Sequence, residues 1–263
     1  METDLIIKSI DIIRIKNNKE IKMKDAVIDE DILTITINKE KAFEMVFSMT
    51  HIQVLAIGFL FTQGIIFTRT DILNQEWNRK KKECHITLSA DALDRLKQFK
   101  QGNMIKGSSG GSLLLNTADN ILIEPTDNFS ITADQVLSLI QQHWDSSILF
   151  HKTGAVHSAG LCDSTKIIEY FEDIGRHNAV DKLAGSILLN QTTTSNKVAT
   201  LSCRMSLEII GKIIKTRIPV VISNAAPTLS AVQLADKAGL TMIGFARNKR
   251  FNIYTHSKRV VLD

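Results

Sequence analysis

The chain has 263 residues, 44% of them hydrophobic, which is enough to bury a substantial core as one large domain or two modest ones. Its 32 Lys and Arg residues against 28 Asp and Glu leave a formal net charge of +4, too small an excess to indicate nucleic acid as an obligatory partner. Residues 1–4 do not resemble a targeting segment, and the longest apolar stretch, residues 54–67, is shorter than the ~20 residues that span a bilayer. We therefore expect a cytoplasmic protein that binds neither nucleic acid nor membranes.

The first half of the chain shows no repeated unit. Apolar, β-branched stretches predict strands at residues 5–15, 32–37 and 85–88, and a buried helix is predicted at residues 52–61. Pro125 and Asp127 precede a predicted helix at residues 132–143, so we place a domain boundary at residue 127. The prediction is a smaller N-terminal α+β domain, residues 1–127, followed by a second domain, residues 128–263.

The second half alternates between strand and helix. Strands are predicted at residues 166–172, 197–202, 218–223 and 241–245, with helices at residues 179–188, 205–215 and 229–238. This βαβ repetition predicts an α/β domain with a mainly parallel sheet. In such a sheet ligands bind beyond the carboxyl ends of the strands, so the turns after the strands are the places to look for a site.

Those turns carry cations. Arg176, Arg204, Arg247, Lys249 and Arg250 each follow one of the predicted strands, which predicts a positive crevice that can hold phosphates. An ordinary polar edge is the alternative, because loops are usually polar.

The first of these turns contains the most residues that can bind a ligand or take part in catalysis. Gly175 lets the backbone approach a ligand at the start of a helix, where free N–H groups favour anions. Asp173 and His177 can contact a ligand, or they can form a structural ion-pair network with Arg176 and Asp181.

Several motifs of this chain occur together and in order. They are residues 58–60 (GFL) with 64–66 (GII), 153–159 (TGAVHSA), 172–185 (EDIGRHNAVDKLAG), 202–206 (SCRMS), 226–228 (APT) and 244–247 (GFAR). Together they resemble the FdhD/NarQ family of formate dehydrogenase accessory sulfurtransferases. The resemblance implies a cytidine-deaminase-like, three-layer α/β/α domain without zinc, in a homodimer. It also implies two partners, a cysteine desulfurase and the catalytic subunit of formate dehydrogenase.

The cargo implied by the resemblance is a molybdenum or tungsten bis-molybdopterin guanine dinucleotide cofactor, which a guanine nucleotide can mimic. Such a polyanion agrees with the predicted positive crevice. The cofactor-binding residues expected on this basis are His157, Asp173, Gly175, Arg176, His177, Asn178, Ser202, Arg204, Ser206, Thr228, Phe245, Ala246, Arg247, Asn248, Lys249 and Arg250. We expect contact with the ligand, rather than catalysis, from both histidines.

The chain departs from the family at the loop that receives sulfur. The family carries C-G-x-C-G there, whereas this chain has Ser109 and Ser112 at the two cysteine positions. A hydroxyl group cannot carry a persulfide, which requires an ionised thiol. Cys203, predicted near a helix N-terminus, can be a substitute thiol or simply a small packed residue.

Three functions therefore remain open. The first is sulfur transfer from the desulfurase to the cofactor, and the second is a non-catalytic chaperone that binds the cofactor. The third is a nucleotide-processing enzyme with Asp173 or His177 as general base. No metal site is expected, because the zinc-deaminase signature and paired cysteine spacings are absent from the sequence; so are the two common phosphate-binding fingerprints.

Overall fold

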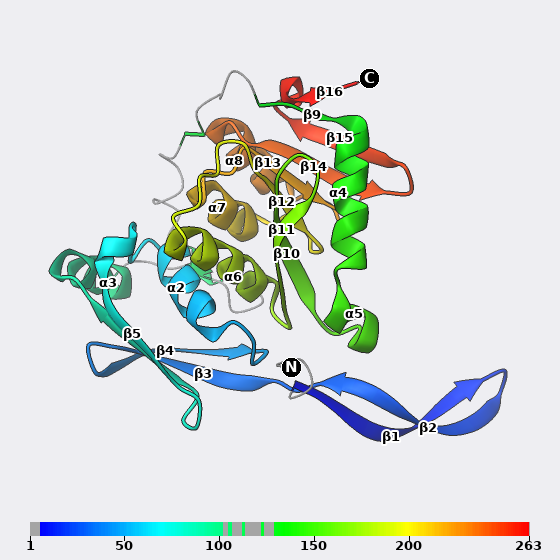
Figure 1. Ribbon diagram of the computed structural model, residues 1–263, viewed down its shortest axis with the longest axis horizontal. Coiled ribbons are helices and arrows are strands. Elements are labelled where there is room, and N and C mark those ends of the chain that lie inside the picture. Colours follow the sequence, from blue (N-terminus) through cyan, green and yellow to red (C-terminus); the bar gives the residue numbers. More distant parts are fainter. Residues whose placement is uncertain (1–5, 102–104, 107–111, 114–121, 124–128, 263) are drawn as a thin grey trace.

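The computed structural model describes residues 6–101, 105–106, 112–113, 122–123 and 129–262. The N-terminal half begins with a hairpin of β1 (Ile7–Lys16) and β2 (Lys19–Ile28), which projects away from the rest of the molecule (Figure 1). A second, four-stranded sheet has the order β4-β3-β6-β5. Its strands are β3 (Asp31–Ile37), β4 (Glu40–Phe47), β5 (Ile72–Asn78) and β6 (Glu83–Leu88).

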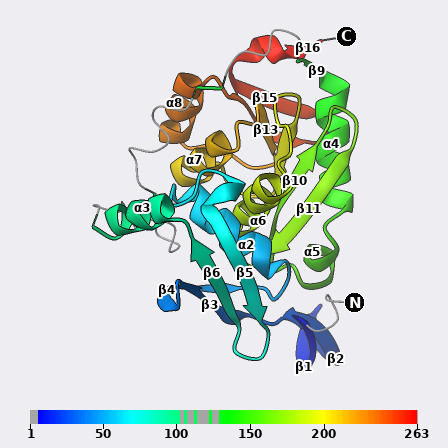
Figure 2. The same ribbon diagram turned by 60° about the vertical axis from the view of Figure 1, so that its left-hand side comes forward.

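Two helices accompany this sheet, α2 (Ile52–Thr62) and α3 (Ala90–Gln101). In β3 alternate residues, Leu33, Ile35 and Ile37, are buried against them, as expected of a strand with one face on a core. Most of α2 is buried, because it lies between this sheet and a helix of the second half (Figure 2). The short strands β7 (Ile105–Lys106) and β8 (Ser112–Leu113) pair with each other.

The second half is built on a six-stranded sheet with the order β11-β10-β12-β13-β14-β15. Its strands are β10 (His157–Cys162), β11 (Ile167–Asp173), β12 (Val198–Leu201), β13 (Val220–Ser223), β14 (Thr241–Arg247) and β15 (Arg250–Thr255). The prediction of a mainly parallel sheet is wrong in its pairing: only β12/β13 and β13/β14 are parallel neighbours. The reason is that β10 inserts antiparallel between β11 and β12, so the sheet is mixed.

Helices cover both faces of this sheet, which gives three layers (Figure 1). One face is covered by α4 (Ala133–Asp145), and the short α5 (Ile148–Thr153) follows it. The other face is covered by α6 (Arg176–Leu189), α7 (Leu207–Lys215) and α8 (Leu229–Ala238). Near the C-terminus, β16 (Val260–Val261) pairs with β9 (Ile131–Thr132). The cytidine-deaminase-like assignment stays a prediction.

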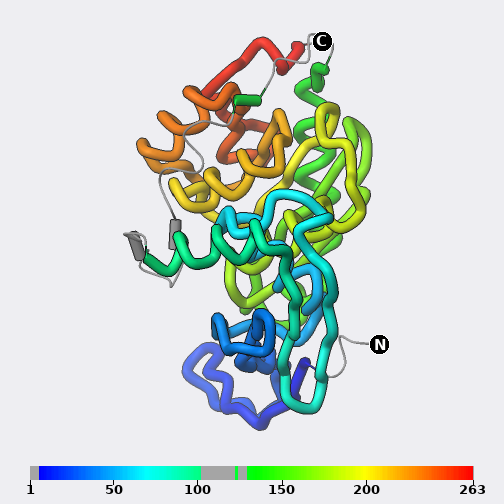
Figure 3. The backbone as a smooth tube through the Cα atoms, turned by 90° about the vertical axis from the view of Figure 1, so that its left-hand side faces the viewer, coloured from blue at the N-terminus to red at the C-terminus, as the bar shows by residue number. Residues whose placement is uncertain are grey.

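The two halves meet where α2 crosses α6, midway along the molecule (Figure 3). Glycines make the crossing close: a Cβ on Gly58 would lie 1.7 Å from the carbonyl oxygen of Asp181, and one on Gly185 would lie 1.9 Å from that of Val54. Any side chain at either position would push the helices apart. The expected boundary near residue 127 lies outside the described residues.

Candidate functional site

The carboxyl ends of four strands gather along one edge of the larger sheet. Strands β11, β12, β13 and β14 run in the same direction, and the N-terminal end of β10 joins them because His157 pairs with Asp173. Beside this edge lies a pocket of about 580 Å³. The residues that line it are Ile140, Gln141, His143, Trp144, Ser147, Phe150, Gly154, Ala155, Val156, His157, Ser158, Ser202, Asn224, Ala246, Arg247 and Asn248.

Five of the expected cofactor-binding residues line this pocket: His157, Ser202, Ala246, Arg247 and Asn248. They come from β10, from the turn after β12 and from the end of β14, so three separate segments converge as the sequence predicted. None of the described residues that line the pocket is Asp or Glu. The pocket therefore suits a neutral or anionic ligand better than a cation.

The pocket has an aromatic wall and a polar floor. The rings of Trp144 and Phe150 meet edge to face, with centroids 5.5 Å apart. At the floor, buried His143 contacts the hydroxyls of Ser158 and Thr200, each at 2.8 Å. Burial lowers the pKa of His143 to about 4, so the ring is neutral at pH 7. The floor is thus a fixed, uncharged hydrogen-bond network.

Asn224 follows β13 and also lines the pocket. Its amide oxygen is buried and has no hydrogen-bond partner among the described residues. Unsatisfied buried acceptors are uncommon and often occur where a ligand binds. The turn itself is rigid, since the Ser223 hydroxyl donates to the carbonyl of Cys203 at 2.8 Å.

The hairpin between β14 and β15 places cations beside the pocket. Asn248 and Lys249 have φ values of 53° and 60°, the left-handed conformation of a two-residue type I′ turn. Arg247 and Arg250 pair across this turn, and both are exposed. The Arg247 guanidinium lies 5.9 Å from the ring centre of Phe245. Three cations are thus displayed together at the rim.

His157 lies half-buried at the start of β10 and faces the same pocket. Burial, together with the nearby charge of Arg176, lowers its pKa. The imidazole is therefore neutral at pH 7 and can either donate or accept one hydrogen bond at a ligand.

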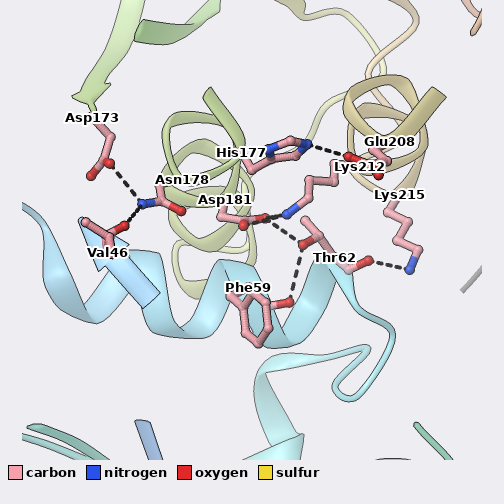
Figure 4. A network of polar contacts seen from close by, with 10 residues as sticks. All are labelled: Val46, Phe59, Thr62, Asp173, His177, Asn178, Asp181, Glu208, Lys212 and Lys215. Atoms are coloured by element: carbon pink, nitrogen blue, oxygen red, sulfur yellow. Dashed lines mark hydrogen bonds and ion pairs between the residues drawn. The ribbon is translucent and has the colours of Figure 1, made fainter. Parts of the chain in front are cut away.

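Asp173, another of the expected cofactor-binding residues, does not line this pocket. It is fully buried, and its carboxylate forms an ion pair with Lys182 at 2.7 Å and accepts the Ser48 hydroxyl at 2.9 Å. It also accepts from the Asn178 side chain, which in turn donates to the carbonyl of Val46 (Figure 4). Asp173 and Asn178 therefore join the two halves of the chain.

His177 is buried in a polar seam between α6 and α7 (Figure 4). Its Nε2 lies 2.7 Å from the carboxylate of Glu208. Burial and the neighbouring charges of Lys212 and Arg176 lower its pKa to about 3, so neutral His177 donates to Glu208. This placement agrees with the alternative of an internal polar network, and His177 does not line the pocket.

The seam continues along the two helices toward α2. Lys212 forms a buried ion pair with Asp181 at 2.6 Å, and Asp181 accepts the hydroxyl of Thr62 at 2.6 Å. Lys215 donates to the carbonyl of Thr62 at 2.5 Å, and burial lowers its pKa to about 8. These contacts satisfy the charges inside the protein, and none of the three side chains lines the pocket beside the sheet edge.

Other expected residues at the edge cap helices instead of lining the pocket. Gly175 precedes α6, and its N–H donates to Asp173 at 3.0 Å. Ser206 and Thr228 are the N-caps of α7 and α8. Arg204 is exposed outside the pocket.

The burial of Cys203 favours the second alternative for this residue, a small packed side chain, over a substitute thiol. Cys203 is 3% exposed, and burial raises its pKa to about 12. Cys162 and Cys84 are fully buried, with pKa values raised by burial to about 12 and about 11. Because the sequence contains only these three cysteines, the chain has no exposed, readily ionised thiol. Ser109 lies outside the described residues, and Ser112 lies in β8.

Sequence reasoning missed several residues of the pocket. Ser158 lies within the motif at residues 153–159, and Asn224 directly follows the strand predicted at residues 218–223, so both had a signal in the sequence. Trp144 and Phe150 gave none, because they come from helices on one face of the sheet. Over the described residues, no cluster of His, Cys, Asp and Glu could hold a metal, and no helix is long and apolar enough to cross a membrane.

Comparisons with known proteins agree with the resemblance. The model of the FdhD/NarQ family matches residues 28–261. The sulfur carrier protein FdhD of Staphylococcus haemolyticus (strain JCSC1435) is 34% identical over 251 residues, 95% of each chain. The protein of that name from Bacillus licheniformis (strain ATCC 14580) gives the same identity and coverage.

The fold is also shared with a solved structure. A protein from Desulfotalea psychrophila, assigned as a formate dehydrogenase accessory protein, superposes with a TM-score of 0.81 at 22% identity. The superposition covers 97% of this chain and 100% of that one. With a family match over nearly the whole length and relatives at 34% identity, the chain belongs to the FdhD/NarQ family.

Proposed function

We propose that this chain serves formate dehydrogenase maturation by binding the bis-molybdopterin guanine dinucleotide cofactor, without carrying sulfur on a thiol of its own. The observation that carries the proposal is the state of the cysteines. All three are buried with raised pKa values, and serine occupies both family cysteine positions. The proposal therefore takes the chaperone function, the second of the three open alternatives.

The pocket and the β14–β15 hairpin beside it fit part of such a cofactor. A volume of about 580 Å³ lies within the range of ~300–1,000 Å³ that is usual for ligand pockets, enough for a nucleotide portion. Trp144 and Phe150 give an aromatic wall for a planar base. Arg247, Lys249 and Arg250 at the rim match phosphate groups in charge and geometry. Once bound, the cofactor supplies the metal chemistry, while these residues hold and orient it.

Sulfur transfer by this chain is the function expected from the family resemblance, and the relatives carry the name of sulfur carriers. A persulfide carrier needs a thiolate that reacts at the surface. We propose that here the cysteine desulfurase, or another partner with an exposed thiol, keeps the persulfide until it meets the cofactor. The catalytic subunit of formate dehydrogenase is the client.

The remaining expectations are part of the same proposal. We place the protein in the cytoplasm, where the cofactor and its client meet, and as a homodimer, so that two copies of the pocket serve one doubly substituted cofactor. Either molybdenum or tungsten fits this account. The purified protein should bind guanine nucleotide without turning it over, which separates it from a nucleotide-processing enzyme.

The hairpin cations give a direct test of the binding site. Replacing Arg247 and Arg250 with alanine should weaken GDP binding at least about 10-fold in calorimetric titration, because each phosphate contact is charge-assisted. The matched control is the double alanine variant of Lys80 and Lys81, two exposed cations in the turn between β5 and β6. Equal losses in the two variants would contradict the placement of the site.

A further inference from the structure

The β1–β2 hairpin is largely exposed: most of its residues, above all those toward the tip, face solvent. It forms a two-stranded sheet of its own, and only its base is anchored: Ile7 and Ile28 pack beside Leu149 and Val156. Beyond that base the ribbon projects into solvent (Figure 1). An isolated two-stranded hairpin is at best marginally stable in water, so an ordered ribbon of this length benefits from a covering surface.

Both faces of the hairpin expose isoleucine. Ile13 and Ile15 lie on one face and are 58% and 62% exposed. Ile10 and Ile21 lie on the other face and are 44% and 42% exposed. Large β-branched side chains on both faces are typical of a strand pair that is buried on both sides.

The hairpin also carries most of the net charge of the chain. Residues 7–28 contain six Lys or Arg and three Asp or Glu, hence +3 of the total of +4. Two of the acids are neutralised within the hairpin, by the pairs Lys24–Asp11 at 3.2 Å and Arg14–Asp25 at 3.8 Å. Toward the tip, Lys16, Lys19 and Lys22 are exposed and form no ion pair with the described residues.

Lysines on an open strand edge often protect it from aggregation. That role does not explain the four exposed isoleucines, which would favour aggregation. Nor does a second copy of this chain complement the charge, because two hairpins carry +3 each and the other 241 residues carry only +1. Nucleic acid would match the lysines but would leave the isoleucines exposed on both faces.

We propose that the β1–β2 hairpin is a docking arm that inserts into an acidic, apolar groove on a partner protein. The basic tip steers the encounter, and the isoleucines supply the buried contact. The family model begins at residue 28, where β2 ends, whereas the superposition on the Desulfotalea psychrophila protein covers 97% of this chain, so most of the hairpin has a counterpart in that fold. The proposal rests on the proposed function only for the identity of the partner, either the cysteine desulfurase or the catalytic subunit of formate dehydrogenase.

The test measures binding of the full chain to each purified partner by surface plasmon resonance. One variant reverses charge at the tip, K19E/K22E, and another removes apolar surface, I13S/I15S. Each should weaken binding to one partner at least about 10-fold, with the charge reversal acting mainly on the association rate. The control K80E/K81E reverses two exposed lysines in the β5–β6 turn and should bind like the original chain.

Two further readouts separate the possible failures. The original chain and all these variants should bind GDP with the same affinity. If the original chain does not bind GDP, that result contradicts the proposed function and leaves the docking arm unaffected. Sedimentation should show an unchanged oligomeric state. A shift from dimer to monomer in I13S/I15S would mean that a second copy covers the arm. That shift, unchanged affinity for both partners, or no binding of either partner by the original chain would overturn the proposal.

Discussion

Buried charges at the carboxyl edge of the larger sheet serve the structure rather than the ligand. Lys182 is fully buried and contacts three oxygens, in the Asp173 carboxylate, the Thr50 hydroxyl and the carbonyl of Glu172. Thr50 belongs to the N-terminal half, so this lysine joins the two halves of the chain. Its ammonium group is the ion-pair partner of a carboxylate that water cannot reach.

Removing this lysine should therefore unfold the protein more readily. The variant K182M leaves Asp173 buried and unpaired, which should cost about 3–5 kcal/mol of the free energy of unfolding in urea. K97M, which removes an exposed lysine, should change it by less than about 0.5 kcal/mol. If K182M instead kept its stability and lost GDP affinity, the Asp173 turn would be part of the ligand site after all.

At the scale of single residues, the sequence predicted which residues lie at the sheet edge better than it predicted what their side chains contact. Polar residues at strand ends were correctly placed along one edge, and His157 and Arg247 do line the pocket. Asp173 and His177 are also polar residues near a strand end, but their side chains point into the protein. There Asp173 pairs with Lys182, and His177 pairs with Glu208. Spacing along the chain cannot reveal this, since the partners are supplied by other elements.

The packing of α2 against α6 is the main contact between elements of the two halves. The helices approach closely because Gly58 and Gly185 face each other's backbone. Three of the bonds between the halves, Thr62 with Asp181, Thr50 with Lys182 and Ser48 with Asp173, lie along the same junction. A change in the helix spacing would break several of them together.

Replacing Gly58 with alanine should lower the free energy of unfolding by about 3 kcal/mol or more, because the new methyl group meets backbone atoms that cannot rotate away. Gly154 provides the control, since a Cβ there meets nothing within 4 Å and only its positive φ of 69° opposes alanine. That substitution should cost about 1 kcal/mol. Similar losses from G58A and G154A in urea unfolding would mean that the crossing is not tight.

Helices and strands were predictable where the spacing of hydrophobic residues was strongly periodic. The helix expected at residues 229–238 coincides with α8, and the helix expected at 132–143 is α4, shifted by one or two residues. Strand β10 was missed because its sequence, HSAGLC, is small and mostly buried, with no alternation to mark it. Strand β2 was missed because it is rich in lysine, although Asn17 and Asn18 in left-handed conformation form its turn.

At the scale of the whole molecule, the missed strand β10 explains what the sequence could not show about the site. Its insertion makes the sheet mixed and brings His157 beside the carboxyl end of β11. The edge then has two sides: the pocket opens beside α4 and α5, and the buried polar seam lies between α6 and α7. A turn residue can belong to either side, and only the fold decides which.

The central claim is that this chain holds the cofactor but carries no sulfur. The most direct measurement is the intact mass of the protein, without reductant, after incubation with a cysteine desulfurase and cysteine, followed by peptide mapping. We predict no sulfur added to Cys84, Cys162 or Cys203, because all three thiols are buried and protonated. A mass increase of one sulfur atom on any of them, formed in the folded protein, would contradict the account.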